Sequence, residues 1–432
     1  MQTRFSPDQM LDPVIAEAND ILRKCVHCGF CTATCPTFVT LGDELDSPRG
    51  RIYLIKEMLE GGKPATEATA RHLDRCLTCL SCTTTCPSGV DYMHLLDHGR
   101  RRVEETYPRP LPDRMLRGLL KWLLPKPGLF RLAMVGAKLA RPISWLFPGR
   151  LSAMLKMSGA KLSSPSPVDT PQIFPANGSR IKRVAMLNGC AQQVVGGNIN
   201  EATVRLLRRH GVEVVVSEGA GCCGALTQHM GDEKAAQTSA RANIAAWLAD
   251  RDNGGLDAIV INASGCGTTV KDYGHMLKHD PDWAEQAAEV SAMAVDISEL
   301  MSDIGLKDAD LPTEAGALEV AYHAACSLQH GQKIVHPPKQ LLRDAGFTIR
   351  DVPEGHICCG SAGTYNLLQP EIASELGQRK AGNIARTGAN VVAAGNIGCM
   401  VQIGEHTGLP VVHTVELLDW ATGGPRPTAL EQ

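Results

Sequence analysis

Residues 25–36 read Cys25-Val-His-Cys28-Gly-Phe-Cys31-Thr-Ala-Thr-Cys35-Pro36, and residues 76–87 repeat the pattern as Cys76-Leu-Thr-Cys79-Leu-Ser-Cys82-Thr-Thr-Thr-Cys86-Pro87. Three thiolates spaced by three residues can wrap one iron–sulfur cluster in a tight turn. The fourth thiolate, followed by proline, leads away and binds the other cluster. The spacing therefore predicts two [4Fe–4S] clusters with crossed ligation, the first held by Cys25, Cys28, Cys31 and Cys86 and the second by Cys76, Cys79, Cys82 and Cys35.

Structural zinc is the alternative for these eight cysteines. Zinc sites usually draw two pairs of cysteines from separate knuckles, rather than three consecutive ligands and a distant fourth. Two matching runs in one chain therefore favour a two-cluster ferredoxin module.

The chain has 16 cysteines, and they form two blocks of eight that are each duplicated. In the first block the two runs are offset by 51 residues. In the second block, Cys190, Cys222 and Cys223 recur 136 residues later as Cys326, Cys358 and Cys359, and Cys266 recurs 133 residues later as Cys399. A fixed internal period indicates a repeated structural unit.

Each copy in the second block has a lone cysteine, a Cys-Cys-Gly triplet and a Gly-Cys pair. Adjacent cysteines bring two sulfurs close together, and the glycine permits a sharp turn around what they bind. Four thiolates per copy could bind a metal or cluster, cycle between dithiol and disulfide, or be buried and inert. His323 and His330 flank Cys326 and could ligate or donate hydrogen bonds. The candidate metal ligands are Cys190, Cys222, Cys223, Cys266, Cys326, Cys358, Cys359 and Cys399.

Composition excludes several classes of protein. The 432 residues carry 43 basic and 46 acidic side chains and only 4% aromatics, which argues against a nucleic-acid binder. The cysteine fraction lies well below the roughly 8–10% of a short secreted disulfide scaffold. The first 20 residues lack the apolar core of a secretory signal, and no stretch has about 18 uncharged apolar residues. We therefore expect a cytoplasmic protein whose cysteines bind metals or do redox chemistry.

The expected domains are a two-[4Fe–4S] ferredoxin-type domain at 1–105, a connector at 106–180, and two cysteine-rich domains at 181–305 and 306–432. From Arg109 to Lys161 the connector has eleven basic residues and one acidic residue, Asp113, with apolar positions at helical spacing. A Pro/Ser-rich linker follows it. This cationic amphipathic segment could lie on anionic lipid, or it could pack on the ferredoxin module or a partner subunit.

Short apolar runs alternate with helical patterns beyond the linker. Strands are expected at 184–189, 212–217 and 258–263, and again at 318–324, 347–352 and 390–396, with helices at 198–210 and 232–250. This alternation predicts parallel α/β layers with the cysteines at the carboxyl ends of strands. The fold class is therefore a multidomain α+β and α/β protein, in which a helical ferredoxin-like module precedes two duplicated α/β domains.

The second block resembles the cysteine-rich CCG domain of heterodisulfide reductase and of iron–sulfur subunits of flavin-dependent dehydrogenases. In the reductase the last cysteine belongs to a C-x-x-C pair, whereas Thr269 and Gln402 stand at the partner positions here. That departure removes one ligand per copy and weakens the case for heterodisulfide chemistry. Related sequences often have proline where this chain has Ala325.

The whole layout resembles the iron–sulfur subunits of bacterial glycolate oxidase, over about residues 20–420. The stretches CVHCGFCTATCPTF, GDELDSPRGRIYLIKEMLEG, HLDRCLTCLSCTTTCPSGV and HICCGSAGTYNLLQP carry the resemblance. It implies an oxidoreductase subunit whose FAD-binding partner subunits oxidise glycolate to glyoxylate, or also D-lactate. The chain would pass electrons to a quinone or other membrane acceptor, with no catalytic residue of its own. Anaerobic glycerol-3-phosphate dehydrogenase and lactate-utilisation proteins have similar layouts.

Three functions therefore stay open at this point: an electron-transfer subunit of a flavin-dependent 2-hydroxy-acid oxidase, a thiol or heterodisulfide reductase, and a zinc-binding scaffold. No phosphate-binding G-x-x-x-x-G-K-S/T or helix-opening G-x-G-x-x-G motif occurs, and nothing resembles a flavin or nicotinamide site. FAD is therefore expected only on partner subunits, and a peripheral contact with the inner face of the cytoplasmic membrane would follow from a quinone acceptor.

Overall fold

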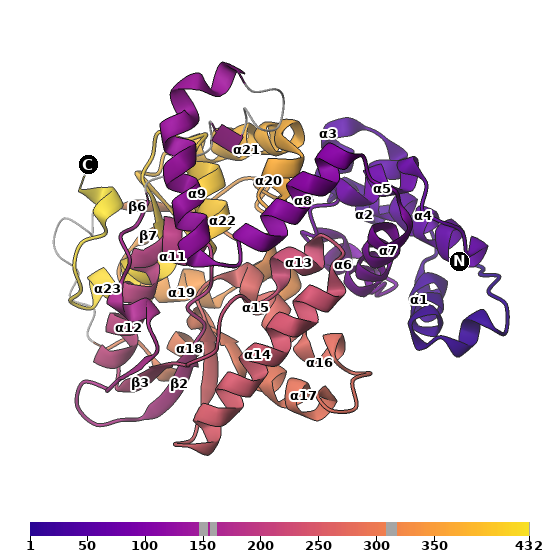
Figure 1. Ribbon diagram of the computed structural model, residues 1–432. Coiled ribbons are helices and arrows are strands. Elements are labelled where there is room, and N and C mark those ends of the chain that lie inside the picture. Colours follow the sequence, from indigo (N-terminus) through magenta and orange to yellow (C-terminus); the bar gives the residue numbers. More distant parts are fainter. Residues whose placement is uncertain (147–153, 156–161, 308–317, 432) are drawn as a thin grey trace.

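The computed structural model describes residues 1–146, 154–155, 162–307 and 318–431. A helical N-terminal module is followed by a two-helix connector and by two α/β units, each built on its own sheet (Figure 1). The predicted fold class is confirmed.

All regular secondary-structure elements in the described residues of the N-terminal module are helices. Its helices are η1 (Gln9–Leu11), α1 (Pro13–Lys24), α2 (Phe30–Ala33), α3 (Pro36–Leu41), η2 (Glu44–Asp46), α4 (Pro48–Gly61), α5 (Glu67–Asp74), α6 (Ser81–Thr85) and α7 (Tyr92–Thr106).

Local sequence explains where the longer helices of this module begin. Asp12 and Ser47 each accept a backbone N–H of the helix that follows, with proline at the first helical position. At the start of α5, the Thr66 side chain likewise accepts the backbone N–H of Thr69. The apolar faces of α1, α4, α5 and α7 then meet in one core, which includes Leu22, Ile55 and Leu95, each fully buried.

The connector forms two helices, α8 (Leu111–Leu123) and α9 (Pro127–Ala140), followed by η3 (Arg141–Leu146). Much of its positive charge is paired within the protein. Arg109 and Arg117 both bond to Asp74, and Lys121 bonds to Glu104. The positive charge of this segment is therefore only partly available for binding anionic lipid or a partner protein.

The first α/β unit contains a five-stranded sheet of order β1-β3-β2-β4-β5, in which only β1 is antiparallel. Its strands are β1 (Gln172–Phe174), β2 (Lys182–Met186), β3 (Val212–Val216), β4 (Ala258–Ile261) and β5 (Ala294–Asp296). Its helices are η4 (Pro167–Asp169), α11 (Gln192–Val195), α12 (Gly197–Arg209), α13 (Ala225–His229), α14 (Glu233–Asp252), α15 (Ser264–Lys271), α16 (Tyr273–Met276), α17 (Ala284–Met293) and α18 (Ile297–Ile304).

The second α/β unit repeats this topology in a parallel sheet of order β7-β6-β8-β9. Its strands are β6 (Glu319–His323), β7 (Thr348–Asp351), β8 (Val391–Ala394) and β9 (Val411–His413). Its helices are η5 (Ser327–Gly331), α19 (Pro337–Asp344), α20 (Tyr365–Leu368), α21 (Pro370–Ala385), α22 (Ile397–Gly404), α23 (Thr414–Ala421) and η6 (Thr428–Leu430).

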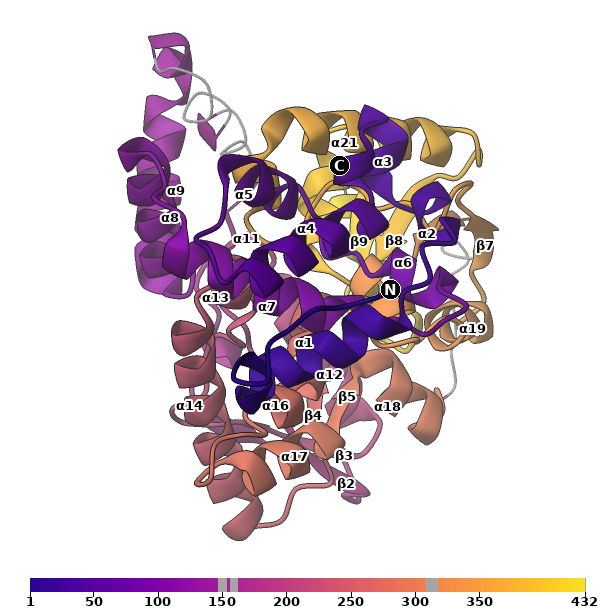
Figure 2. The same ribbon diagram turned by 90° about the vertical axis from the view of Figure 1, so that its right-hand side faces the viewer.

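The two α/β units are joined by a shared hydrophobic core. Helix α12 of the first unit packs on α23 of the second, and α18 packs on α19. These pairs are equivalent under exchange of the two units, so the duplication is also an approximate two-fold arrangement in space. The N-terminal module lies across both units, with α7 against α13 and α3 against α21 (Figure 2).

All six strands predicted from the sequence are present within a few residues, and so are the helices expected at 198–210 and 232–250. Strands β1, β5 and β9 were not predicted. Each is only three residues long, and such short runs give no clear periodic signal.

Candidate iron–sulfur and metal centres

The two N-terminal cysteine runs fold into matching loops. His27 and Gly29 in the first loop have φ of 56° and 86°, and Thr78 and Leu80, 51 residues later, have 52° and 60°. Positive φ is strained for residues other than glycine and persists only where the surroundings demand it. The positive φ values at matching positions show that both runs adopt one wrapped backbone, which is the shape needed to hold several thiolates around one cluster.

The eight N-terminal sulfurs line two neighbouring cavities. The first, an open cavity, is lined by Cys25, Cys28, Cys31 and Cys86, with Cys82 also on its wall. The second is lined by Cys35, Cys76, Cys79 and Cys82. The structure thus brings the fourth cysteine of each run to the other run's cavity, as crossed ligation requires. Each cavity therefore offers the four thiols that a [4Fe–4S] cluster needs, and Cys82 lies on the wall of both.

The two cavities differ in their exposure to solvent. Cys28 is exposed, whereas Cys35 and Cys76 are buried. Burial raises the pKa of Cys31 to about 11, and burial beside other thiols raises the pKa of Cys79 and Cys82 further. These thiols stay protonated without metal, and bound iron would deprotonate them.

A buried charge cluster that the sequence analysis did not single out supports the second cavity. Asp46 is fully buried and bonds to Arg51 at 3.2 Å, His72 at 2.9 Å and Arg75 at 2.8 Å. Arg51 also donates to the Cys35 sulfur at 3.8 Å. The signal was present in the sequence, since Asp46 and Arg51 lie in the GDELDSPRGRIYLIKEMLEG stretch.

The second cavity lies against the second α/β unit. Cys79 packs beside a cluster that includes Cys326 and Cys358, and Cys326 is close enough to affect the Cys79 thiol electrostatically. Thr84 Oγ1 lies 2.8 Å from His330 Nδ1, and the Tyr365 hydroxyl donates to the Arg75 carbonyl at 3.0 Å. This arrangement joins the two blocks of cysteines, which the sequence separates by about a hundred residues.

The cysteines of each α/β unit gather near the carboxyl ends of its strands. In the first unit Cys190 Sγ lies 3.6 Å from Cys222 Sγ. In the second unit, hydrogen-bonding contacts link Cys326 to Cys358, Cys358 to Cys359, and Cys359 to Cys399. Contacts with Cys358, Cys399 and His323 lower the pKa of Cys359, while those with Cys326 and Cys359 raise the pKa of Cys358.

The glycine of each Cys-Cys-Gly triplet is required by its surroundings. Gly224 and Gly360 have φ of 87° and 94°, and a Cβ would lie 2.9 Å from the Ala236 carbonyl oxygen of α14 and 2.4 Å from the Ala373 carbonyl oxygen of α21. A side chain at either position would therefore clash with the backbone of that helix.

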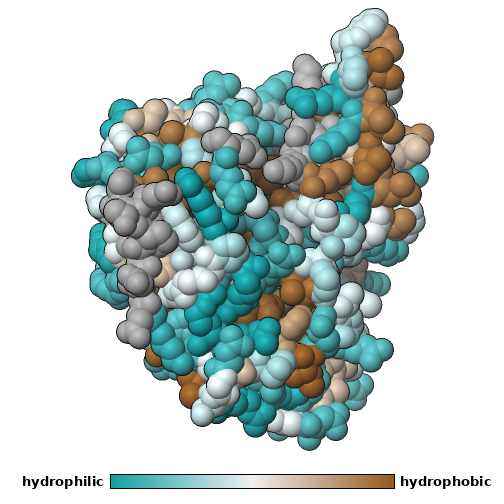
Figure 3. All heavy atoms as spheres, turned by 90° about the vertical axis from the view of Figure 1, so that its left-hand side faces the viewer, coloured by the Kyte–Doolittle hydropathy of each residue, from teal (hydrophilic) through white to brown (hydrophobic). Residues whose placement is uncertain are grey.

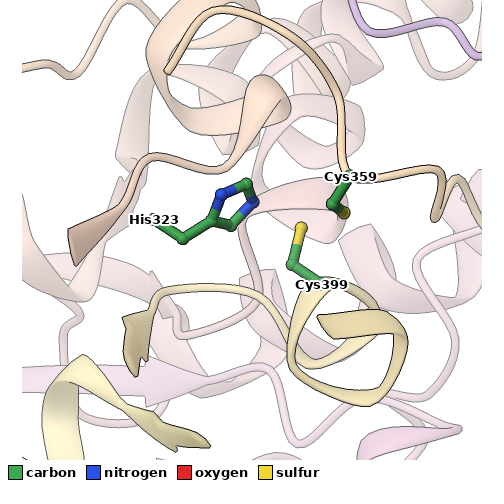
Figure 4. A group of neighbouring side chains, drawn as sticks. All are labelled: His323, Cys359 and Cys399. Atoms are coloured by element: carbon green, nitrogen blue, oxygen red, sulfur yellow. The ribbon is translucent and has the colours of Figure 1, made fainter. Parts of the chain in front are cut away.

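Thr269 and Gln402, which replace the second cysteine of each C-x-x-C pair, have structural hydrogen bonds. Thr269 donates to the Gly265 carbonyl at 3.3 Å, and Gln402 donates to the Ala373 carbonyl at 2.9 Å. His330 contacts Thr84 of the N-terminal module rather than the sulfurs, and burial lowers its pKa to about 4. His323 is the histidine that the structure brings to the cysteines (Figure 4).

Comparisons with known proteins agree with this architecture. Residues 21–90 match the model of a 4Fe-4S dicluster domain, and residues 184–271 and 320–404 match the model of a cysteine-rich domain. A crystal structure of a hypothetical protein from Helicobacter pylori shares the fold, with a TM-score of 0.55 and 10% identity over 97% of this chain and 74% of that chain.

Two relatives show the family, and a third is more distant. The glycolate oxidase iron–sulfur subunit of Escherichia coli (strain K12) is 44% identical over 98% of this chain and 99% of its own length. The probable glycolate oxidase iron–sulfur subunit of Bacillus subtilis (strain 168) is 32% identical over 93% and 94%. Lactate utilization protein A of Oceanobacillus iheyensis is 27% identical over 55% of this chain and 96% of its own length. The chain therefore belongs to the family of glycolate oxidase iron–sulfur subunits.

Proposed function

We propose that this chain is the electron-transfer subunit of an oxidoreductase complex. It takes electrons from a partner FAD subunit that oxidises glycolate to glyoxylate, and D-lactate as a second substrate, and delivers them to a quinone or other membrane acceptor. The observation that carries the proposal is the pair of adjacent cysteine-lined cavities, which share Cys82, Pro48 and Tyr92 on their walls. Membership of the family supports it.

The proposed ligands follow the two cavities. Cys25, Cys28, Cys31 and Cys86 hold one [4Fe–4S] cluster, and Cys76, Cys79, Cys82 and Cys35 hold the other. When bound, each cluster accepts and releases one electron at a time, so two of them can drain a two-electron flavin stepwise. The protein residues fix the spacing of the two sites and exclude water from the second.

The solvent-exposed side of the first cavity is the proposed docking site of the flavin subunit. Cys28 is exposed there, beside Val26 and Phe30, whose side chains are 67% and 63% exposed. Exposed apolar side chains around a redox site are typical of a protein–protein contact. The second cavity faces the second α/β unit instead, so electrons entering at Cys28 would move toward the interior.

The connector is the proposed contact with the membrane. Ten of the twenty large apolar side chains exposed among the described residues lie between Leu111 and Leu146. They form a hydrophobic band on the part of the molecule that stands out at the top of Figure 1, seen from the side in Figure 3. Arg114, Lys126 and Arg141 are exposed in the same segment, as a contact with anionic lipid requires. None of the helices in the described ranges has the length and apolar content of a bilayer-crossing segment.

We also propose the domain limits at 105, 180 and 305, with the end of the 106–180 segment contributing η4 and β1 to the first α/β unit. Metal binding by the cysteines of the two α/β units is a further proposal. The relative of the lactate utilization type favours lactate as the runner-up substrate of the complex, although it matches only 55% of this chain.

Co-purification tests the proposed function. The tagged full-length chain is expressed with the neighbouring FAD-binding subunits of its family, and glycolate-dependent reduction of a dye is measured on the complex. We expect stoichiometric flavin, about eight irons per chain from two [4Fe–4S] clusters, and activity with glycolate above that with lactate or glycerol 3-phosphate. A chain that binds no flavoprotein, or a complex that prefers glycerol 3-phosphate, would contradict the proposal.

A further inference from the structure

The two α/β units differ at one buried position beside their cysteines. Three residues before the lone cysteine, the second unit has His323 and the first has Leu187. Both side chains are buried, with 1% and 2% exposure. Neither ring nitrogen of His323 has a hydrogen-bond partner of normal geometry among the described residues. The imidazole interacts with the Cys359 thiol but has no well-formed hydrogen bond. Burial of a polar group in that state is unfavourable, and a bound metal ion would relieve it.

The imidazole points at two cysteine sulfurs. A ring nitrogen of His323 and the Sγ atoms of Cys359 and Cys399 all lie within 4.8 Å of one another, and all three residues are buried. Figure 4 shows them converging from the end of β6, from the loop after β7 and from the first turn of α22. The three side chains come from separate elements, so it is the fold that assembles the group.

This group has the composition of a transition-metal site. Thiolate and imidazole together suit Zn²⁺ and Fe²⁺, whereas carboxylates and water suit Mg²⁺ and Ca²⁺. Ligands at about 2.0–2.3 Å from one tetrahedral ion lie about 3.3–3.8 Å apart, so a small contraction of the observed group would seat an ion.

We propose that the second α/β unit binds a single divalent transition-metal ion, Zn²⁺ or Fe²⁺, through His323, Cys359 and Cys399. Cys326 or Cys358 supplies the fourth ligand, because contacts link both to this group. Both candidates for the fourth ligand belong to the cluster that packs beside Cys79 of the second cluster cavity.

The first unit is a natural comparison because it keeps the cysteines and lacks the histidine. Leu187 packs in a hydrophobic core there with Cys223, the counterpart of Cys359. Among the described residues of that unit, no three potential ligand atoms lie within 4.8 Å of one another. The His323 group therefore has no counterpart in the first unit, whose four cysteines are linked by hydrogen-bonding contacts of their own.

Metal analysis of the full-length protein, purified without oxygen and then loaded with Zn²⁺ or Fe²⁺ alone, tests the proposal. His323→Leu gives the second unit the residue of the first, and Cys359→Ser removes a proposed ligand. We expect both variants to contain one metal ion fewer per chain than the wild type. Cys223→Ser, the matched change in the first unit, is expected to leave the ion of the second unit in place. The test compares the metal content per chain of the variants with that of the wild type, and neither substrate nor partner subunit is needed. Its outcome is therefore independent of the proposed substrate and partners.

Two further measurements keep the test decisive if His323→Leu folds poorly. His323→Cys replaces one metal ligand by another and is expected to retain the ion. X-ray absorption at the zinc edge of the loaded wild type is expected to show a nitrogen ligand at about 2.0–2.1 Å beside sulfur at about 2.3 Å. Equal metal content in wild type and His323→Leu, an all-sulfur zinc spectrum, or a loss of about four irons rather than one ion would overturn the proposal.

Discussion

At the scale of single residues, the position of Cys35 matters most. It follows three cysteines of its own run, yet it lies in the cavity lined by Cys76, Cys79 and Cys82. Its sulfur accepts from Arg51 at 3.8 Å and lies 3.3 Å from the Thr37 hydroxyl. Hydrogen bonds to a cysteine sulfur favour its thiolate and tune a bound cluster. Cys35 therefore belongs to the second cavity both by position and by its surroundings.

Pairs of cysteine substitutions test this crossed ligation. Cys35→Ser is expected to remove one cluster and about half of the iron, because a [4Fe–4S] site with three thiolates is labile. Cys35→Ser combined with Cys79→Ser should cost no more iron than either single change, since both act on one cluster. Cys35→Ser combined with Cys28→Ser should remove nearly all of it. Iron analysis and EPR of the reduced protein measure these losses.

Ligation within each run would give the reverse result. Cys35→Ser with Cys28→Ser would then leave half of the iron, and Cys35→Ser with Cys79→Ser would leave little. Thr34→Ser, a change beside Cys35 that removes no ligand, is the control and should retain both clusters.

At the scale of elements, the α8–α9 connector has a divided surface. Its inward face is tied to the body by Arg117, which is buried and bonds to Asp74 at 2.8 Å, and by Arg131, which bonds to the Gln193 carbonyl at 2.9 Å. Its outward face presents Leu132 and Leu139, which are 70% and 78% exposed. The connector therefore packs on the rest of the protein with one face and exposes apolar side chains on the other. From the sequence, packing on the protein and contact with lipid were alternatives.

Substitutions on the outward face test the proposed lipid contact. Leu132→Glu with Leu139→Glu changes only exposed positions, so we expect the fold and the iron content to be unchanged. Binding to anionic vesicles should weaken at least tenfold, because burying one leucine contributes about 1.5–3 kcal/mol and the added charge is repelled. Co-sedimentation of the full-length protein with phosphatidylglycerol vesicles at low salt measures the change.

Leu11→Glu is the matched control, since Leu11 is 82% exposed and lies far from the connector in sequence. It should bind vesicles as the wild type does. If the connector variant keeps its vesicle binding but no longer binds the flavin subunit, the outward face contacts protein rather than lipid.

At the scale of the whole molecule, the N-terminal module meets the first α/β unit through a network of charged groups. His94 lies between Asp91 at 2.6 Å and Asp272 at 2.9 Å, and its ring stacks on His275 at 3.4 Å between centroids. Glu17 bonds His98 on one side and His275 and Lys278 on the other. Burial would lower the pKa of His94, but its bonds to Asp272 and Asp91 outweigh this effect and raise the pKa to about 10.

The raised pKa of His94 predicts a loss of stability at high pH. Its pKa is higher in the folded than in the unfolded chain, so its contribution is complete below about pH 6.5 and is lost as the pH rises through about 10. Between pH 7.5 and 10.5 we expect the wild-type Tm to fall about 2–4 °C more than that of His94→Gln. Other groups that titrate in this range affect both proteins equally. Equal falls would show that His94 is not charged in the folded protein.

Much of this organisation could be predicted from the sequence. The spacing of the two runs at 25–36 and 76–87 predicts which cysteines are the cluster ligands, and a fixed offset identifies the two Cys-Cys-Gly units. The long buried strands are predictable because a short apolar run such as AIVINA is typical of a strand buried on both faces. Short elements such as β5 and β9, and the Asp46 cluster, were missed because they depend on contacts between segments far apart in the chain.

The sequence by itself determined the family and the fold class and supplied the cysteines proposed to bind metal, because these follow from local spacing and repetition. Only the tertiary structure decided how the parts meet. It places the second cluster cavity against the second α/β unit, pairs much of the connector's charge internally, and turns His323 toward Cys359 and Cys399. Such contacts arise from the packing of whole units against one another, and no local pattern in the chain records that packing.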